Sequence, residues 1–185
     1  LNSADYGVPQ MRDRYWIIAI KRPASPDLPI SEYEPASETI SWLHKPYKSW
    51  DEVICPFINK KQVLSDRLRS KLPTAPFDWH LCSGWEKSRD ITMVSKGSPS
   101  PTITTGMNRP SLLPWVVARD TDGVVLGHCL DIPQMAALQG FPGNYIWPQS
   151  TRSERARCFE AIGNAVSPPI MQAIAQANLA KALAA

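Results

Sequence analysis

Two arginines and a glutamine, Gln10, Arg12 and Arg14, stand at alternate positions directly before an apolar run at residues 15–20. Arginine stays protonated in proteins, and its planar guanidinium holds a fixed orientation toward an acceptor. A guanidinium held beside a rigid strand can therefore stabilise an oxygen atom that gains negative charge during a reaction. The alternative is that both arginines are solvated charges flanking an edge strand.

The apolar run that would position these arginines reads Tyr-Trp-Ile-Ile-Ala-Ile. Its β-branched isoleucines predict a strand covered on both faces, as in the parallel or mixed sheet of an α/β domain. Four prolines within residues 23–35 then end any regular element.

The last third of the chain predicts three helices. Asp131 can cap a short helix that Gly140 ends. A second helix is expected over residues 150–163, and a third has Ser167 as its N-cap and Pro168 as its first residue. The third helix should pack on a sheet or another helix through one apolar face: Ile170, Met171, Ile174, Leu179 and Leu183.

The middle of the chain carries weaker signals. A short helical piece is expected within residues 40–54, and apolar residues near helical spacing predict a helix over residues 59–72. Residues 98–118 read as a strand, a glycine turn and a second strand. A hairpin should follow, with Asp122 and Gly123 in its turn.

The overall composition is that of a globular protein. The chain has 185 residues, of which 43% are hydrophobic and 20% charged, with a net charge of +3. This length allows one domain, or one and a half. No apolar run is long enough for a membrane span, and no secretion signal is recognisable. The four separated cysteines are typical of reduced cytosolic thiols.

Three stretches together resemble the DNA (cytosine-5) methyltransferases. DYGVPQMRDR (5–14) is similar to their Gln-x-Arg-x-Arg block, LDIPQMAALQGFPGNY (130–145) to the block that follows it, and IGNAVSPPIMQAI (162–174) to their final block. The stretches occur in the family's order and bracket nearly the whole chain.

The resemblance implies a role for each residue of the first block. In this family a cysteine attacks carbon 6 of a cytosine flipped out of the duplex, and carbon 5 then takes a methyl group from S-adenosylmethionine. By its position in the block, Arg14 would contact the base and stabilise the charge that develops on its carbonyl oxygen. Arg12 would support the loop or the backbone, and Gln10 could orient either arginine.

The second block departs from the family pattern at His128, Gln134 and Ala137, where the family usually has arginine, glutamate and arginine. The loss of these three charges favours a neutral packing role over a salt bridge. The match over residues 138–142, LQGFP, is close. It is interpreted as structural, with a helix stop followed by an aromatic anchor.

The final block implies a cofactor site and a fold. Asn164, Ala165 and Val166 would edge an S-adenosylmethionine pocket that this chain supplies only in part, and Gly163 would allow a close backbone approach. The alternative is that these residues only form the turn that precedes an ordinary helix N-terminus. The expected fold is mixed α/β: part of a Rossmann-like sheet domain (1–23 and 128–185) and a small, irregular, β-rich target-recognition domain (24–127).

The target-recognition region would read double-stranded DNA. Its candidate contacts are Thr102 to a phosphate, and Thr104, Asn108 and Arg109 near base edges. Lys60 and Lys61 belong to a basic cluster suited to phosphates, although a solvated helix face is an equally good interpretation. Zinc at His80 and Cys82, or at His128 and Cys129, lacks a supporting C-x-x-C pair, so no metal is expected.

The family's proline-cysteine block is absent from this sequence, because no cysteine follows a proline. The resemblance therefore predicts the C-terminal half of a methyltransferase, inactive without an N-terminal half that carries the cysteine. Leu1, which is not a start methionine, favours the same expectation. Alternatives are a non-catalytic DNA-binding subunit or remnant, and an RNA-directed relative. A cytoplasmic, nucleoid-associated location in a bacterium or phage-infected cell is implied, without a membrane.

Overall fold

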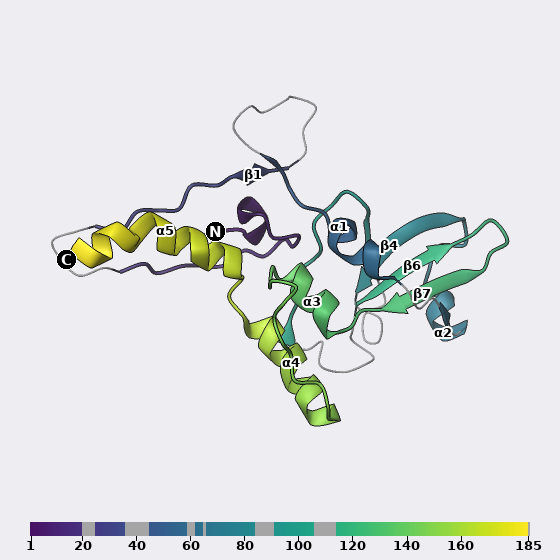
Figure 1. Cartoon of the computed structure of the whole chain (residues 1–185). Coiled ribbons are helices and arrows are strands. Elements are labelled where there is room, and N and C mark those ends of the chain that lie inside the picture. The colour runs from purple at the N-terminus through teal and green to yellow at the C-terminus, as the bar shows by residue number, and fades with distance from the viewer. Residues whose placement is uncertain are drawn as a thin grey trace.

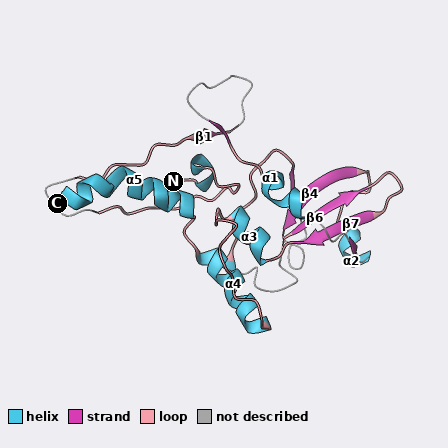
Figure 2. Ribbon diagram, viewed as in Figure 1, coloured by secondary structure: helices cyan, strands magenta, loops and turns pink. Residues whose placement is uncertain are grey.

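The computed structural model describes residues 1–19, 25–35, 45–58, 62–64, 66–83, 91–105 and 114–184. The fold is mixed α/β. The elements are η1 (Ser3–Tyr6), β1 (Tyr33–Glu34), β2 (Lys45–Pro46), α1 (Trp50–Ile54), η2 (Cys55–Phe57), β3 (Gln62–Val63), α2 (Asp66–Arg69), β4 (Phe77–Ser83), β5 (Thr92–Ser95), β6 (Trp115–Arg119), β7 (Val125–Cys129), α3 (Ile132–Leu138), α4 (Arg152–Asn164) and α5 (Pro168–Ala184). The strands β4, β6 and β7 lie at one end, the helix α5 at the other, and α3 and α4 between them (Figure 2).

The main sheet has five strands in the order β3-β7-β6-β4-β5, and every neighbouring pair is antiparallel. A separate pair, β1 and β2, is parallel. The predicted hairpin is confirmed as β6 and β7. Its turn is held by the carboxylate of Asp120, which accepts from the backbone N–H groups of Asp122 and Val124. Gly123 supplies the positive φ of 78° that the turn requires.

Successive residues of the central strands point to opposite faces of the sheet, and each face has its own core. Val116 and Leu81 join the larger core, which also contains residues of α1, α3 and α4. Val117 and Cys82 join a smaller core with Leu64 on the other face. The larger core runs without a break across the predicted domain boundary at residue 127. We call the sheet with α1, α3 and α4 the body.

The predicted helix ends in the last third are confirmed. The Asp131 side chain accepts from the backbone N–H of Gln134, and α3 ends before Gly140, whose φ is 86°. The helix predicted over residues 150–163 is α4, and α5 begins at Pro168 as expected. The short helical piece expected within residues 40–54 is α1. The residues that begin and end these helices act on neighbours within a few positions, so packing elsewhere in the chain does not change the helix ends.

One helix prediction and one strand prediction in the middle of the chain are wrong. Within residues 59–72, the described part contains the strand β3 and only four helical residues in α2, because Gln62 and Val63 pair with β7. At residues 98–105, the expected strand is reduced to one bridge between Ser100 and Gln10. Prolines at positions 99 and 101 remove the N–H groups that a longer ladder needs.

The predicted buried strand at residues 15–20 is also wrong as stated. Residues 15–19 lie alongside α5 without a strand partner in the described part of the chain, and Tyr15 and Ile17 are fully exposed. Ile20 lies outside the described residues.

The last helix likewise lacks the packing expected of it. Ile170 is buried, whereas Met171, Leu179 and Leu183 are exposed. Figure 1 shows α5 extending from the body, with residues 15–19 on one side and residues 25–31 on the other. We call these three segments the arm. Among the described helices, none combines the length and apolar character needed to cross a membrane.

Candidate functional site

The first sequence block lies along the loop at residues 100–103. Ser100 donates its N–H to the Pro9 carbonyl at 2.9 Å, and its own carbonyl accepts from the N–H of Met11 at 2.8 Å. The hydroxyl of Thr102 donates to the Met11 carbonyl at 2.7 Å. These bonds fix the backbone from which Arg12 and Arg14 project.

Arg12 is buried and joins two distant loops. Its guanidinium donates to the carbonyl of Ile103 at 2.6 Å and to the carbonyl of Gly163 at 2.8 Å. Burial lowers the pKa of Arg12, and the nearby charge of Arg14 lowers it further. A guanidinium that binds two backbone carbonyls holds the backbone in place, which is the supporting role expected for Arg12.

Gly163 permits a close approach between the end of α4 and the loop that contains Thr104, and Arg12 bonds to both segments. A Cβ atom at this position would lie 2.6 Å from the backbone carbon of Thr104 and from the backbone nitrogen of Thr105. A backbone neighbour cannot move aside as a flexible side chain can. The close approach expected at Gly163 therefore exists, and it is to the loop that contains Thr104.

Gln10 belongs to a buried chain of amides and bonds to neither arginine, contrary to the expectation that it could orient one of them. Its Nε2 donates to Oε1 of Gln139 at 2.8 Å, and its Oε1 accepts from the N–H of Ile103 at 3.3 Å. Gln139 in turn donates to the carbonyl of Ala165 at 2.8 Å. Both glutamines are fully buried, so this chain of bonds links all three sequence blocks through the interior.

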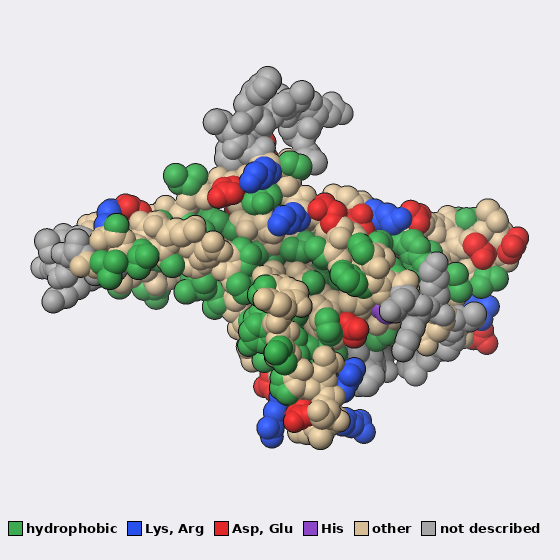
Figure 3. Space-filling view, viewed as in Figure 1, with side chains coloured by type: hydrophobic (Ala, Val, Ile, Leu, Met, Phe, Trp, Pro, Cys, Tyr) green, Lys and Arg blue, Asp and Glu red, His purple; other side chains and the backbone are tan. Residues whose placement is uncertain are grey.

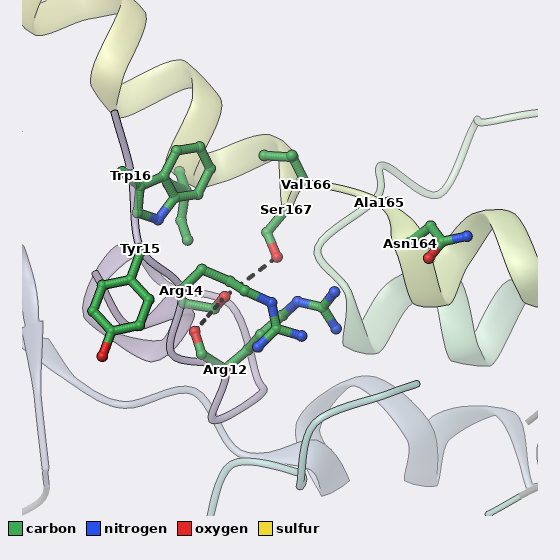
Figure 4. Close-up of a pocket in the computed structure, with 10 residues that line it drawn as sticks. Arg12, Arg14, Tyr15, Trp16, Asn164, Ala165, Val166 and Ser167 are labelled. Carbon is green, nitrogen blue, oxygen red and sulfur yellow. Dashed lines mark hydrogen bonds between the residues drawn. The ribbon is translucent and has the colours of Figure 1, made fainter. Parts of the chain in front are cut away.

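Arg14 is exposed and faces a small cavity of about 200 Å³. Its guanidinium donates to the carbonyl of Asp13 at 2.6 Å. The cavity is lined by Arg12 and Arg14, by Ser3, Tyr15 and Trp16, and by residues 164–167 with Ile170. The guanidinium groups of Arg12 and Arg14 both extend toward the turn between α4 and α5 (Figure 4).

This turn contains the three predicted cofactor residues. Asn164 and Val166 are exposed and Ala165 is partly buried. The hydroxyl groups of Ser167 and Ser3 lie 3.4 Å apart, and Ser3 Oγ also donates to the carbonyl of Arg12 at 3.3 Å. The structure therefore brings Arg12, Arg14 and residues 164–166 together at one cavity.

The predicted DNA-contacting residues are only partly described. Thr104 is exposed, next to Gly163. The proton of the Thr102 hydroxyl is already donated to the Met11 carbonyl, so contact with a phosphate would require this bond to break and the hydroxyl to turn. Asn108, Arg109, Lys60 and Lys61 lie outside the described residues, and their contacts stay predictions.

Two of the three charge losses in the second block fall on one contact. His128 Nε2 and Gln134 Oε1 lie 2.9 Å apart, and both residues are buried. Both side chains therefore pack in the interior and contact each other. Phe141 packs edge-on against Tyr145 and Trp147, with ring centroids 5.2 and 5.1 Å away, as expected of an aromatic anchor.

None of the four cysteines lines the cavity. Burial raises the pKa of Cys82 to about 12 and that of Cys129 to about 11. The pKa of Cys55 and that of Cys158 are also raised, chiefly by burial. Each thiol is thus held in its protonated form near neutral pH, which is the less nucleophilic form. Among the described residues, no group of three histidines, cysteines or carboxylates could hold a metal ion.

The sequence matches no protein-family model, no curated protein and no solved structure. The site must therefore be interpreted from its own geometry. The sequence did not point to Ile103, Gln139 or Ser3, because their roles depend on contacts between residues far apart in the chain.

Proposed function

We propose that this chain is the C-terminal part of an S-adenosylmethionine-dependent DNA (cytosine-5) methyltransferase. It would supply DNA recognition and part of the active site to an N-terminal half that carries the catalytic cysteine. In this proposal α4, α5 and residues 15–19 belong to a Rossmann-like sheet domain completed by that half, and the five-stranded sheet belongs to the target-recognition domain.

The direct bonding between the three sequence blocks carries the proposal. The three blocks are defined by their resemblance to the family alone, and they lie up to about 150 residues apart. Gln10 of the first block bonds to Gln139 of the second, which bonds to Ala165 of the third. Arg12 bonds to Gly163 directly. Blocks that resembled the family by chance would have no reason to share one buried network.

Arg14 has the properties that the chemistry needs. It is exposed at a cavity, while the backbone beside it is fixed by the buried Arg12. Attack by a cysteine on carbon 6 of cytosine drives negative charge onto the ring carbonyl. A guanidinium already oriented toward that oxygen would stabilise the charge as it forms.

The cofactor assignment fits this chain only in part. S-adenosylmethionine supplies the methyl group that carbon 5 accepts. A pocket for a ligand of that class is on the order of 300–1,000 Å³, whereas the cavity beside residues 164–166 is about 200 Å³. Asn164, Ala165 and Val166 would therefore form one edge of the pocket, with Ser167 as a further hydroxyl donor.

The test is to mix this chain with an N-terminal half of a cytosine-5 methyltransferase, cut before its Gln-x-Arg-x-Arg block. Transfer of tritiated methyl groups to duplex DNA is then measured. Activity is expected only in the mixture. Activity from this chain alone contradicts the proposal. Specific duplex binding without activity in any mixture favours the non-catalytic alternative, and preferred methylation of structured RNA favours the RNA-directed one.

The residue-level test is Arg14→Ala in the active mixture. Because one preorganised donor is lost, turnover should fall by about 10²–10³-fold, and DNA affinity should change far less. Arg152→Ala is the matched control, since Arg152 is an exposed arginine at the start of α4 and outside the cavity. Equal losses of turnover in the two variants would contradict the role assigned to Arg14.

A further inference from the structure

Another cavity lies in the body, apart from the one at Arg14. Its volume is about 540 Å³, which falls within the range of roughly 300–1,000 Å³ that small-molecule sites occupy. Its walls are supplied by α1 with η2, by α3 and by the loop at residues 141–149. It shares no lining residue with the cavity at Arg14, so the proposed methyl transfer gives it no role.

Aromatic side chains make up much of this lining. Tyr145 and Trp147 have ring centroids 4.6 Å apart and ring planes inclined by 42°, and Phe141 lies edge-on to both. Phe57, which is 60% exposed, lines the cavity from η2. Figure 3 shows hydrophobic side chains at the surface over α3 and α4. Because the three clustered rings are not parallel, they present π faces as well as edges to their surroundings.

The loop that carries the three clustered rings is fixed to the body. The N–H of Phe141 donates to the carbonyl of Ala136 at 3.0 Å. The thiol of Cys158 donates to the carbonyl of Pro148, also at 3.0 Å. Phe141 and Trp147 pack against the larger core. The aromatic wall is therefore in place before a ligand arrives, which lowers the entropic cost of binding.

Asp131 is the only charged side chain among the described residues that line this cavity. Its Oδ1 accepts from the N–H of Gln134 at 3.0 Å, whereas its Oδ2 makes no hydrogen bond and its carboxylate no salt bridge with the described residues. The oxygen of the Gln134 side chain is already used, because it accepts from the N–H of Asp131 and lies 2.9 Å from Nε2 of His128. The described lining thus carries one negative charge and no positive side chain to balance it.

We propose that this cavity binds an organic cation, an ammonium ion carried on a compact apolar group. The apolar group would lie among the aromatic and aliphatic walls, as in most small-molecule sites. The ammonium ion is attracted both by the faces of the rings and by Oδ2 of Asp131. A neutral apolar ligand would leave the carboxylate unpaired, and an anion would be repelled by it.

The experiment titrates the full chain at pH 7 with three probes of similar shape and different charge. Benzylamine is protonated at this pH, benzyl alcohol is neutral and benzoate is an anion. The readout is the indole N–H signal of Trp147 in the NMR spectrum, which is identified by its loss in Trp147→Phe. We expect benzylamine to cause a saturable shift and to bind about fivefold or more tightly than benzyl alcohol, and benzoate to cause no shift.

Two asparagine variants test the charge. Asp131→Asn removes the carboxylate but keeps a good helix cap, so the melting temperature of the chain should change little. It should weaken binding of benzylamine by about fivefold or more and leave that of benzyl alcohol within about twofold. Asp122→Asn is the matched control, because Asp122 is exposed in the hairpin turn and outside the cavity. It should change neither affinity.

A third variant tests the aromatic wall. Tyr145→Leu keeps an apolar side chain at a half-exposed position but removes the ring. Loss of one cation–π contact should weaken binding of benzylamine by about two- to fivefold. Binding of benzylamine unchanged by this variant would remove the ring of Tyr145 from the site and overturn the assignment of the aromatic wall.

The remaining outcomes decide the inference. Equal affinities for benzylamine and benzyl alcohol, or equal effects of the two asparagine variants, mean that charge plays no part and overturn it. Benzoate that binds as tightly as benzylamine overturns the sign of the charge. Absence of a saturable shift at Trp147 with any probe overturns the cavity as a binding site. Because binding is measured without methyl transfer, failure of the proposed function would leave each of these results unchanged.

Discussion

The body and the arm contain similar apolar residues and bury them to very different extents. In the body, Met135, Leu138 and Ile162 have no exposed surface, because α3 and α4 pack together beside the sheet. In the arm, Leu28 is 76% exposed and Leu183 is 80% exposed. The body therefore holds a core of its own, whereas the arm leaves large apolar side chains exposed.

The largest expected effect is a difference between two leucine-to-alanine substitutions. Leu138→Ala leaves a cavity in the body and should lower the free energy of unfolding by about 2–5 kcal/mol. Leu179→Ala removes a mostly exposed side chain from the arm and should change it by less than about 0.5 kcal/mol. Urea unfolding followed by circular dichroism measures both.

The same pair of substitutions can be compared in the complex with the proposed N-terminal half. In complex with the N-terminal half, Leu179→Ala should become costly, because α5 would then cover a sheet. If Leu179→Ala destabilises the free chain as much as Leu138→Ala does, the arm has a core of its own and the contrast between the two regions is wrong.

Much of the body's local structure could be predicted from the sequence. Asp131 and Gly140 bound α3, and Asp122 and Gly123 form the hairpin turn, because caps and turns are decided by neighbours within a few residues. The helix expected over residues 59–72 failed for the opposite reason. Pairing of Gln62 and Val63 with β7, over sixty residues away in the chain, overrode the local spacing of apolar residues.

The residues at the candidate site could be predicted from the sequence, but the hydrogen bonds that join them could not. Arg12, Arg14 and residues 164–166 were expected from the sequence blocks, and they share one cavity. Nothing local to Gln139 or Ile103 signals that each completes a bond to the first block. The apolar run at residues 15–19 predicted a buried strand, which the structure does not contain, because the sequence alone could not tell whether a sheet lies beside it.

The second prediction tests the contact that joins the final block to the body. Gly163→Ala places a methyl group 2.6 Å from the backbone of Thr104 and Thr105. Overpacking against fixed backbone should cost about 1–3 kcal/mol of unfolding free energy. It should also disturb the carbonyl that Arg12 binds, so methyl transfer in the mixture should fall as well.

Gly143→Ala is the matched control for this change. No atom lies within 4 Å of the Cβ position at Gly143, and its φ is not in the left-handed region. We expect little change in unfolding or activity. Equal behaviour of the two alanine variants would mean that the final block is not held against the loop containing Thr104, and the join between the arm and the body would have to be elsewhere.

The smallest expected effect concerns a hydrogen bond between η1 and the segment that leads into α1. Tyr47 donates its phenol proton to Oδ1 of Asp5 at 2.6 Å, which ties η1 to the segment leading into α1. Burial and then this hydrogen bond raise the pKa of Tyr47 to about 12. The unfolded chain should titrate near the ordinary value of about 10.

The sign of the pH effect follows from the raised pKa. Below pH about 10 both states keep the phenol proton, so the contribution of the bond to stability is fully present. Between pH about 10 and about 12 the unfolded state ionises first, and that contribution is lost. Stability of the wild type should therefore fall more steeply over this range than that of Tyr47→Phe, which has no phenol proton to lose.

Asp5→Asn separates the two causes of the shift. It keeps an acceptor oxygen but removes the negative charge, so the pKa of Tyr47 should fall part of the way toward 10, as NMR of its ring carbons would report. A titration unchanged by Asp5→Asn would mean that the charge of Asp5 does not contribute to the raised pKa of Tyr47, for which burial is the largest cause. In that case the bond that ties η1 to the segment leading into α1 would gain nothing from the charge of Asp5.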